Sequence, residues 1–369
     1  RGRIRTGDEI AAEIEFVGGQ YSTGALGIAV KVLSEHSALA FDLVRDLLRN
    51  PSFPEDRFEK LREDVLAAIE LRDEDPTKVA RRLFYEEAYR GHPWHRPSMG
   101  SLDTVGKITR DDVKAHFDRF FRPENTILAI AGDIDQESAA EEIRTRLETW
   151  TGKGAWDRPR PPPAVRQTEP RTVYRTFKSQ QVRIHLGHVG IVRTNPDYAA
   201  LRVMETILCS SPGFTNRLAR TVRDAEGLAY DVAGSITGGA GAVASPFQVV
   251  LGVEAKNCDK GLRIVMDELR RFREEGPTER ETEDARRYLQ ASFVSAWETS
   301  DDVAAWLLEV RRHGLGIDEA ARHVEALGKV TPEEVRRVAK KYVDLENLTT
   351  VMVGPIDANG KLLEGEPQR

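Results

Sequence analysis

Residues Ile108–Asp135 read ITRDDVKAHFDRFFRPENTILAIAGDID, and residues Val330–Asp357 repeat this stretch without a gap as VTPEEVRRVAKKYVDLENLTTVMVGPID. Seven aligned pairs are identical, at an offset of 222 residues. Each copy predicts a helix capped by a threonine, Thr109 or Thr331, with acidic residues in its first turn. An apolar strand that ends at a glycine is expected to follow each helix. The chain is therefore predicted to contain two copies of one domain.

The composition limits the classes of protein to which the chain can belong. Its 369 residues are 40 % apolar, which is enough for two hydrophobic cores. The net charge is −6 and no basic block is present, which argues against a nucleic-acid partner. Cys209 and Cys258 are far apart and form neither a disulfide framework nor a C-x-x-C metal pair. No apolar run is long enough to span a bilayer.

The N-terminal end has no initiating methionine and no signal-like segment. Arg1 lies a few residues before a helix that already resembles the interior of a domain. We therefore expect the true N-terminus to be missing from the sequence, and no compartment is predicted.

The pattern of apolar residues predicts an α+β fold in each half, with a mostly antiparallel sheet and helices packed on it. The first half is expected to contain one strand across Tyr21–Leu33 and helices at about 6–16, 37–48, 55–72, 77–89 and 136–149. The second half is expected to contain strands within 173–191, 229–236, 247–253 and 348–353, and helices at 198–208, 215–223 and over most of 254–342.

A proline-rich stretch separates the two halves. Residues 152–171 include the run Arg-Pro-Arg-Pro-Pro-Pro and few large apolar residues, which indicates a semi-rigid linker. The predicted domains are therefore an N-terminal domain at 1–151, whose start is missing, and a C-terminal domain at 172–369.

The histidines do not form a recognisable metal motif. His92 and His95 lie in a turn that contains prolines, and His185 and His188 lie on a strand-like segment where they face opposite sides. We expect each of them to be hydrogen-bonded or at the surface, and we predict no metal site from these residues.

One glycine-rich string resembles a nucleotide-binding fingerprint. Residues Gly239–Ala244 fit the pattern G-x-G-x-x-A, which binds a dinucleotide only where a helix follows at once. Pro246 and a β-type run follow here instead. A flexible hairpin loop is therefore expected.

Residues Thr215–Ala233, which read TNRLARTVRDAEGLAYDVA, form the most informative local motif. They predict a helix that ends at Gly227 and a strand that begins near Tyr230. Across that turn Arg223 and Tyr230 can meet and donate hydrogen bonds to a peptide carbonyl or carboxylate. From spacing alone, a surface arginine–aspartate pair with a core tyrosine explains the same residues.

The run Gly-Leu-Ala-Tyr at 227–230, preceded by Asn-Arg-Leu and Val-Arg, resembles the second-domain signature of the pitrilysin/insulinase-type zinc metallopeptidases. This family includes mitochondrial processing peptidase. Further segments that carry the resemblance are Asn50–Phe53, Asp73–Pro76, Gly91–Pro93, Gly132–Asp133 and Val353–Pro355. The resemblance implies a duplicated processing-peptidase-like (LuxS-like) α+β fold whose two domains close around an unfolded peptide. In that family Arg223 and Tyr230 would match the pair that holds the substrate backbone.

The family's zinc chemistry requires groups that this sequence does not show. The inverted motif H-x-x-E-H lies upstream of a segment that resembles residues 3–10, where this sequence begins. The third zinc ligand is a glutamate eight residues before the equivalent of Pro76, with a second glutamate seven residues earlier. Those positions hold Ala68 and Leu61 here. A methyl group cannot coordinate zinc, and both residues fit the apolar stripe of an amphipathic helix with Phe58, Val65 and Ile69.

Two glutamates offer an alternative ligand pair. Glu63 and Glu70 keep the seven-residue spacing two positions further along the helix. A shift of two residues turns a side chain by about 200° around the helix axis. These carboxylates would therefore need a different helix register to reach a metal, and solvated side chains explain them better.

The leading hypothesis is a zinc-less member of this family that forms half of a peptide-enclosing chamber. It would contribute no catalytic residue but would hold an unfolded peptide through Arg223 and Tyr230. Its partner would be a zinc-bearing paralogue in a hetero-oligomer, or a second copy in a homodimer. The partner's metal would activate water while this chain orients the peptide. Two alternatives stay open: an active zinc metalloendopeptidase with its H-x-x-E-H before Arg1, and a structural subunit that binds no peptide.

Overall fold

A computed structural model of the chain describes residues 5–156, 159–210, 216–225, 227 and 229–363, without the side chains of residues 223–225, 229 and 230. Its internal contacts form two compact units. Unit 1 comprises residues 1–63, 106–159 and 296–314, and unit 2 comprises residues 64–105, 160–295 and 315–369. These units are groups of residues in contact, not continuous stretches of sequence. The division into domains 1–151 and 172–369 stays a prediction.

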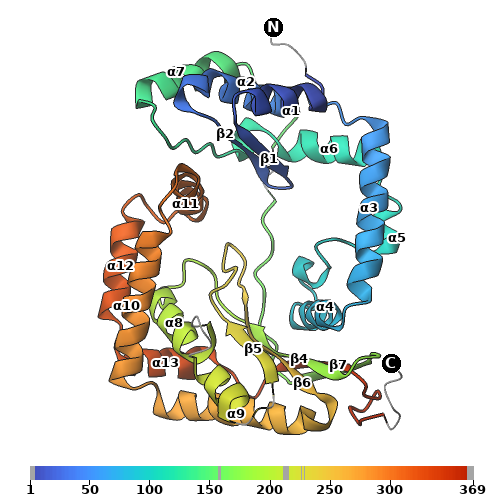
Figure 1. The fold of residues 1–369 in the computed structure, drawn as a ribbon, viewed down its shortest axis with the longest axis vertical. Helices are drawn as coiled ribbons and strands as arrows, with labels where there is room; N and C mark the ends of the chain where they lie inside the picture. Colours follow the sequence, from blue (N-terminus) through green and yellow to red (C-terminus); the bar gives the residue numbers. More distant parts are fainter. Residues whose placement is uncertain (1–4, 157–158, 211–215, 226, 228, 364–369) are drawn as a thin grey trace. The chain divides into compact units, whose positions relative to one another are not determined.

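Unit 2 is built on a five-stranded sheet with the strand order β3-β7-β4-β6-β5 (Figure 1). The last strand in the sequence, β7, lies between β3 and β4. It is parallel to β3, and all other neighbours are antiparallel. This arrangement confirms the predicted α+β fold with a mostly antiparallel sheet. The strands are β3 (Arg171–Thr176), β4 (Gln181–Val189), β5 (Ala229–Ser235), β6 (Pro246–Glu254) and β7 (Thr349–Gly354).

Both faces of this sheet are covered. Successive side chains of a strand point to opposite faces, so each strand contributes to two different apolar clusters. Val182, Ile184 and Leu186 of β4 enter the large core formed with α8 (Tyr198–Glu205), α9 (Cys258–Glu275) and α13 (Pro332–Tyr342). The opposite face packs against α4 (Pro76–Ala88) through a second cluster that includes Phe84, Val351 and Val353. Figure 1 shows α9 and α13 on one side of the sheet and α4 on the other.

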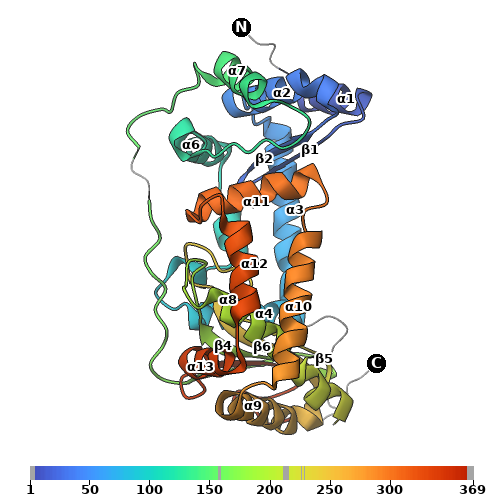
Figure 2. The same ribbon diagram turned by 90° about the vertical axis from the view of Figure 1, so that its left-hand side faces the viewer.

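Further helices of unit 2 extend away from the sheet. The helices α10 (Glu279–Ser295) and α12 (Glu319–Lys329) run side by side (Figure 2). Two short π-helical segments occupy Thr206–Ser210 and Ala219–Ala225, and α5 covers Leu102–Val105. No helix in the described part of the chain is both long and apolar enough to cross a membrane.

Unit 1 has a small apolar core, in which Ile10 and Ile14 pack against Leu43. The long helix α3 (Glu55–Asp73) runs from unit 1 into unit 2. The other elements of unit 1 are α1 (Gly7–Phe16), β1 (Gln20–Gly24), β2 (Gly27–Lys31), α2 (Ser37–Arg49), α6 (Arg110–Phe120), α7 (Gln136–Leu147) and α11 (Ser300–His313).

The two copies of the repeat share their helix and its cap. Thr109 forms a capping box with Asp112 at the start of α6, and Thr331 forms the same box with Glu334 at the start of α13. The apolar segments that follow differ. The second copy forms β7, whereas Ile127–Gly132 forms no strand, so the strand predicted there is wrong. A strand requires ladder hydrogen bonds, and no described strand is paired with this segment.

The single strand predicted over Tyr21–Leu33 is also wrong. These residues form a hairpin of β1 and β2, in which Gly24 pairs with Gly27 across a two-residue turn. Two glycines bracket Ala25 and Leu26, and such a pair is a turn signal in the middle of the run.

Candidate functional site

The predicted clamp residues lie on two adjoining elements of unit 2. Arg223 belongs to the π-helical segment Ala219–Ala225. Tyr230 is the second residue of strand β5, where the pairing with β6 is irregular between Ala229 and Asp231. Gly227 connects them with a φ of 61°, a left-handed conformation that glycine adopts without steric cost. The side chains of Arg223 and Tyr230 lie outside the described part of the structure, so the clamp stays a prediction.

The π-helical segment is anchored by apolar side chains that point into the core of unit 2. Leu218, Ala219 and Val222 are fully buried in the core of unit 2. Short π-helical turns are often associated with functional sites, because they displace one turn of a helix outward. The backbone that carries Arg223 is therefore anchored by packing.

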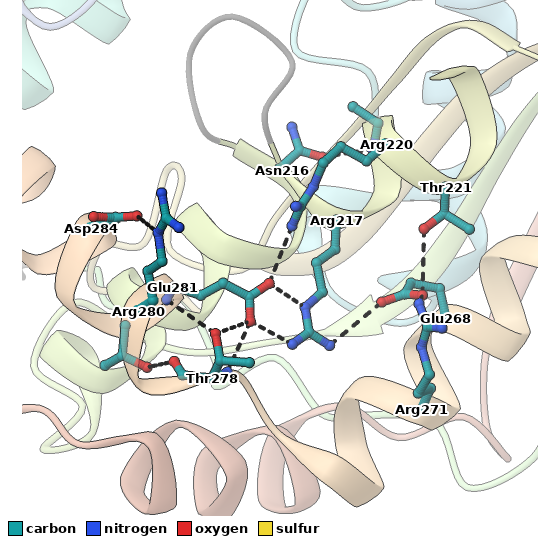
Figure 3. Close-up of polar contacts among 12 residues, drawn as sticks. Asn216, Arg217, Arg220, Thr221, Glu268, Arg271, Thr278, Arg280, Glu281 and Asp284 are labelled. Atoms are coloured by element: carbon teal, nitrogen blue, oxygen red, sulfur yellow. Dashed lines mark hydrogen bonds and ion pairs between the residues drawn. The ribbon is translucent and has the colours of Figure 1, made fainter. Parts of the chain in front are cut away.

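Arg217 ties the same segment to the start of α10 (Figure 3). Its Nε and Nη2 donate to the two carboxylate oxygens of Glu281 at 2.8 and 2.6 Å. Nη2 also donates to the carbonyl of Gly276 at 3.2 Å, and the guanidinium lies over the ring of Phe272 at 5.0 Å. A bidentate arginine–carboxylate pair of this kind fixes both direction and distance.

Glu281 is the centre of this network. It forms a capping box with Thr278, whose backbone N–H and hydroxyl both donate to Oε2 at 2.9 Å. Arg220 adds a third cationic contact at 3.2 Å. Burial raises the pKa of Glu281, but the hydrogen bonds from Arg217 and Thr278 outweigh it, and the pKa falls to about 2. The hydrogen bond to Glu281 in turn raises the pKa of Arg217.

Glu268 of α9 is a second carboxylate that contacts the π-helical segment, and its side chain is only 1 % exposed. It forms an ion pair with Arg271 and accepts a hydrogen bond from Thr221 at 3.5 Å. Its Oε1 has no hydrogen-bond donor among the described residues, and Arg217 Nη1 lies 3.8 Å from it. A carboxylate this deeply buried requires nearby cations, and the arginines supply them.

Strand β5 is held at both ends. At its start, Arg183 Nη1 donates to both carboxylate oxygens of Asp231 at 2.8 Å. At its end, the buried Glu205 accepts from the backbone N–H groups of Ile236 and Thr237 at 2.8 and 2.7 Å. The strand that carries Tyr230 is thus tied to neighbouring elements at both ends.

The residues that the family resemblance assigns to zinc do not suit a metal. Ala68 lies half-buried on α3 and has no donor atom, and Glu63 and Glu70 are both exposed to solvent. In the described part of the chain, no three or more histidine, cysteine, aspartate or glutamate side chains are grouped so that they could hold a metal ion. Leu61 is 62 % exposed, so the predicted apolar stripe is wrong at that position. Only Ile69 of α3 is fully buried.

The histidines are placed individually. His92 is buried, with Nε2 2.9 Å from the carbonyl of Pro162. His185 and His188 point to opposite faces of the sheet, beside Phe84 and Phe247 respectively. Burial lowers the pKa of both His185 and His188 to about 4.

The glutamates that hold the site were missed by reasoning from sequence alone. Glu281 had a signal, since Thr278 stands three residues before it, as in a capping box. Glu268 also had a signal, since it stands three residues after Val265 and four before Phe272, on the apolar face of α9.

A family model described as "Peptidase M16 inactive domain" matches residues 107–289 of this chain. An uncharacterized zinc protease of Streptomyces coelicolor is 27 % identical over 96 % of this chain and 78 % of its own length. The non-peptidase homolog YmxG of Helicobacter pylori is 23 % identical over 90 % of this chain and 76 % of its own length.

Solved structures share the fold. A peptidase M16 inactive domain from Pseudomonas fluorescens superposes with a TM-score of 0.87 at 24 % identity, covering 97 % of this chain and 86 % of that one. The periplasmic protease PqqL of Escherichia coli gives 0.77 at 15 % identity, covering 94 % of this chain and 38 % of that one. Together with the sequence matches, these findings confirm the resemblance: the chain is similar in sequence and in fold to the pitrilysin/insulinase-type, or M16, peptidase family.

Proposed function

We propose that this chain is a zinc-less M16-family protein that holds an unfolded peptide for a zinc-bearing partner chain. The observation that carries the proposal is Ala68, which stands where the family resemblance places the third zinc ligand. A carboxylate oxygen is needed at that position, and a methyl group cannot replace it. The relative named a non-peptidase homolog supports the same assignment.

Arg223 and Tyr230 would be the peptide-holding pair. Two neighbouring arginines, Arg217 and Arg220, are already bound by Glu281, so their charges are used within the fold. Arg223 would therefore be the arginine that binds the carbonyl or carboxylate of the substrate. The anchored π-helical segment and the fixed strand β5 would keep the pair in place without a large ordering cost on binding.

In this division of labour the partner would supply the zinc chemistry and this chain would orient the substrate. Correct orientation of an extended peptide lowers the entropic part of the barrier, even when the orienting residues do not touch the reacting atoms. The partner would be a paralogue in a hetero-oligomer or a second copy of the chain.

The test is peptide cleavage by the tagged chain purified together with its partner, using a quenched fluorescent unstructured peptide. Arg223→Ala and Tyr230→Phe should lower kcat/KM, and Arg223→Ala should do so by about 100-fold. Arg220→Ala is the matched control, since this neighbouring arginine faces Glu281. Turnover that is unchanged by Arg223→Ala would remove the case for the clamp.

A second candidate function is that of an active zinc metalloendopeptidase, with H-x-x-E-H before Arg1. The relatives named zinc proteases favour it. It predicts stoichiometric zinc and peptide hydrolysis by the isolated full-length protein, both of which the zinc-less assignment excludes. Metal analysis by mass spectrometry together with a hydrolysis assay distinguishes the two.

A third candidate is a structural subunit. A chain within a structure of complex III from Candida albicans shares the fold, with a TM-score of 0.72 at 16 % identity. This candidate predicts that the chain binds no unstructured peptide, and that Arg223 and Tyr230 serve only the turn between helix and strand. Fluorescence anisotropy with a labelled unstructured peptide tests it directly.

A further inference from the structure

A largely buried ion pair ties the segment that carries Arg223 to the start of α10 (Figure 3). The side chains of Arg217 and Glu281 are 13 % and 21 % exposed, and the guanidinium donates to both carboxylate oxygens. Arg220 adds one contact to the same carboxylate, but its side chain is 54 % exposed. Exposed ion pairs contribute little to stability, whereas a shielded bidentate pair is strong and directional. Arg217 is therefore the stronger of the two ties.

The pair lies close to the point where the helical turns of the segment begin. Asn216 Oδ1 accepts the N–H of Ala219 at 2.9 Å, as the side chain of a helix N-cap does. Arg217 follows this cap directly in the sequence, six residues before Arg223. The position of Arg217 therefore determines where the turns that lead to the clamp start.

Two sides of the segment are held by contacts of different kinds. Leu218 and Val222, four residues apart, enter the apolar core of unit 2. Arg217 and Thr221, also four residues apart, approach Glu268 of α9 at 3.8 and 3.5 Å. Hydrophobic burial is non-directional, whereas charge-assisted hydrogen bonds require a particular geometry. The polar side should therefore set the rotation of the segment about its own axis, and with it the direction of the clamp arginine.

We infer that Glu281, acting through Arg217, is a positioning residue for the clamp arginine Arg223. This inference rests on the proposed function, because it concerns how the peptide-holding residue is kept in place. Glu281 would not touch the peptide itself, since its oxygens already accept hydrogen bonds from two arginines and Thr278. It would act by keeping the backbone of the segment in one rotation, so that the substrate meets a preorganised donor.

The test is a double-mutant cycle in the cleavage assay of the chain purified with its partner. Glu281→Gln keeps the size of the side chain and removes its charge, and it should lower kcat/KM roughly tenfold. Combined with Arg223→Ala, it should cause no further loss, because its effect passes through Arg223. A purely structural role would instead give a further loss of roughly the same factor in the double variant, and that result would overturn the inference.

A second variant tests the other member of the pair. Arg217→Lys keeps the positive charge but loses the planar fork that binds both carboxylate oxygens. It should lower kcat/KM roughly tenfold, and it should add no further loss to Glu281→Gln, because each change removes the same pair. Independent losses from the two changes would contradict the proposed route through Arg217.

Two controls separate positioning from a general loss of stability. Glu283→Gln is the matched control, since this glutamate lies two residues further along α10 and pairs with Arg287 outside the network. Thr331→Ala removes the cap of α13 in the same unit. Both variants should retain kcat/KM when rates are normalised to the folded fraction measured by circular dichroism. A loss in Thr331→Ala equal to that in Glu281→Gln would show that stability alone is responsible.

The failure of this inference differs from the failure of the proposed function. Unchanged turnover in Glu281→Gln, beside a clear loss in Arg223→Ala, would remove the positioning role and leave the clamp. Unchanged turnover in Arg223→Ala would remove the clamp, and the positioning role with it.

Discussion

At the scale of single residues, ionisable groups that are partly or fully buried are accommodated in two different ways. Glu281 and Arg217 compensate each other through two hydrogen bonds, and the pKa of Glu281 falls to about 2. His185 is instead kept neutral, since it is buried with a Nδ1 that has no hydrogen-bond partner among the described groups. Both groups make the fold more stable as the pH rises, because both folded pKa values are lowered: Glu281 acts between about pH 2 and 4.5, and His185 between about pH 4 and 6.5.

Glu281→Gln is expected to destabilise the fold by about 2 kcal/mol at pH 7, because it removes charge-assisted hydrogen bonds from Arg217 and Arg220. The folded pKa of about 2 lies below the ordinary value of 4.5. The wild-type carboxylate therefore contributes stability above pH 4.5, and this contribution is lost as the pH falls toward 2. Urea unfolding at pH 7 and pH 3.5 measures it. The variant should lack this part of the pH dependence; an identical profile would contradict the assignment.

His185→Phe should leave stability at pH 7 unchanged or raise it, because a phenyl ring fits beside Phe84 and removes a buried nitrogen without a partner. The folded pKa of about 4 lies below the ordinary value of 6.5, so the unfolded chain binds the proton first. The wild type should therefore lose stability as the pH falls from 6.5 to 4, by about 1.4 kcal/mol per unit of pKa difference. Denaturant unfolding across this range should show a shallower loss in the variant. An equal loss in both proteins would show that other groups cause it.

At the scale of elements, local sequence signals describe helix starts well and strand partners poorly. The threonine caps of α6 and α13 were predicted from Thr109 and Thr331 and are confirmed. The strand predicted after α6 is absent, although its apolar pattern matches that of β7. Residue patterns specify which side chains can be buried, but pairing depends on neighbours that lie far away in the sequence.

Thr109→Ala and Thr331→Ala should each cost about 1 kcal/mol, because each removes one side of a capping box. The loss from Thr331→Ala should appear in the main unfolding transition, since α13 packs on the large core. Thr109→Ala should act on α6, which has no fully buried side chain. Thermal unfolding followed by circular dichroism measures both. Serine replacements retain the hydroxyl and should restore most of the stability.

The candidate site shows the same limits of sequence reasoning. The positions of Arg223 and Tyr230 on either side of Gly227 were predictable from the helix–glycine–strand pattern. The polar partners of Glu268 and Glu205 were not, because they come from other elements: Thr221 reaches Glu268, and the backbone amides of Ile236 and Thr237 reach Glu205. The packing of α4 on the sheet of unit 2 was equally hidden, since about a hundred residues separate α4 from β4 along the chain.

At the scale of the whole molecule, the two units differ in how much apolar surface they bury. The main cluster of unit 2 extends over the sheet, α8, α9 and α13, whereas the core cluster of unit 1 consists of Ile10, Ile14 and Leu43 with partly buried neighbours. A smaller core offsets less conformational entropy. The resemblance to the relatives extends over most of the chain, but the stability of the chain is expected to be unevenly distributed.

Unit 1 should therefore open at a lower denaturant concentration than unit 2. Hydrogen–deuterium exchange under native conditions should be faster in α2 and α7 than in α8 and α13, by at least roughly tenfold. Leu201→Ala, in the core of unit 2, should cost about 2–5 kcal/mol and shift the later transition. Leu71→Ala, at a position that is 64 % exposed, is the matched control and should be close to neutral. A single cooperative transition seen by all probes would contradict this description.

The position of β7 has a consequence for synthesis on the ribosome. Residues Thr349–Gly354 are translated more than a hundred residues after β4, yet they fill the slot between β3 and β4. A nascent polypeptide must therefore carry an open slot in its sheet for more than a hundred codons after β4 has emerged. During that time two strand edges are available to chaperones or to the wrong neighbour, and a premature stop before Thr349 would leave them permanently unpaired.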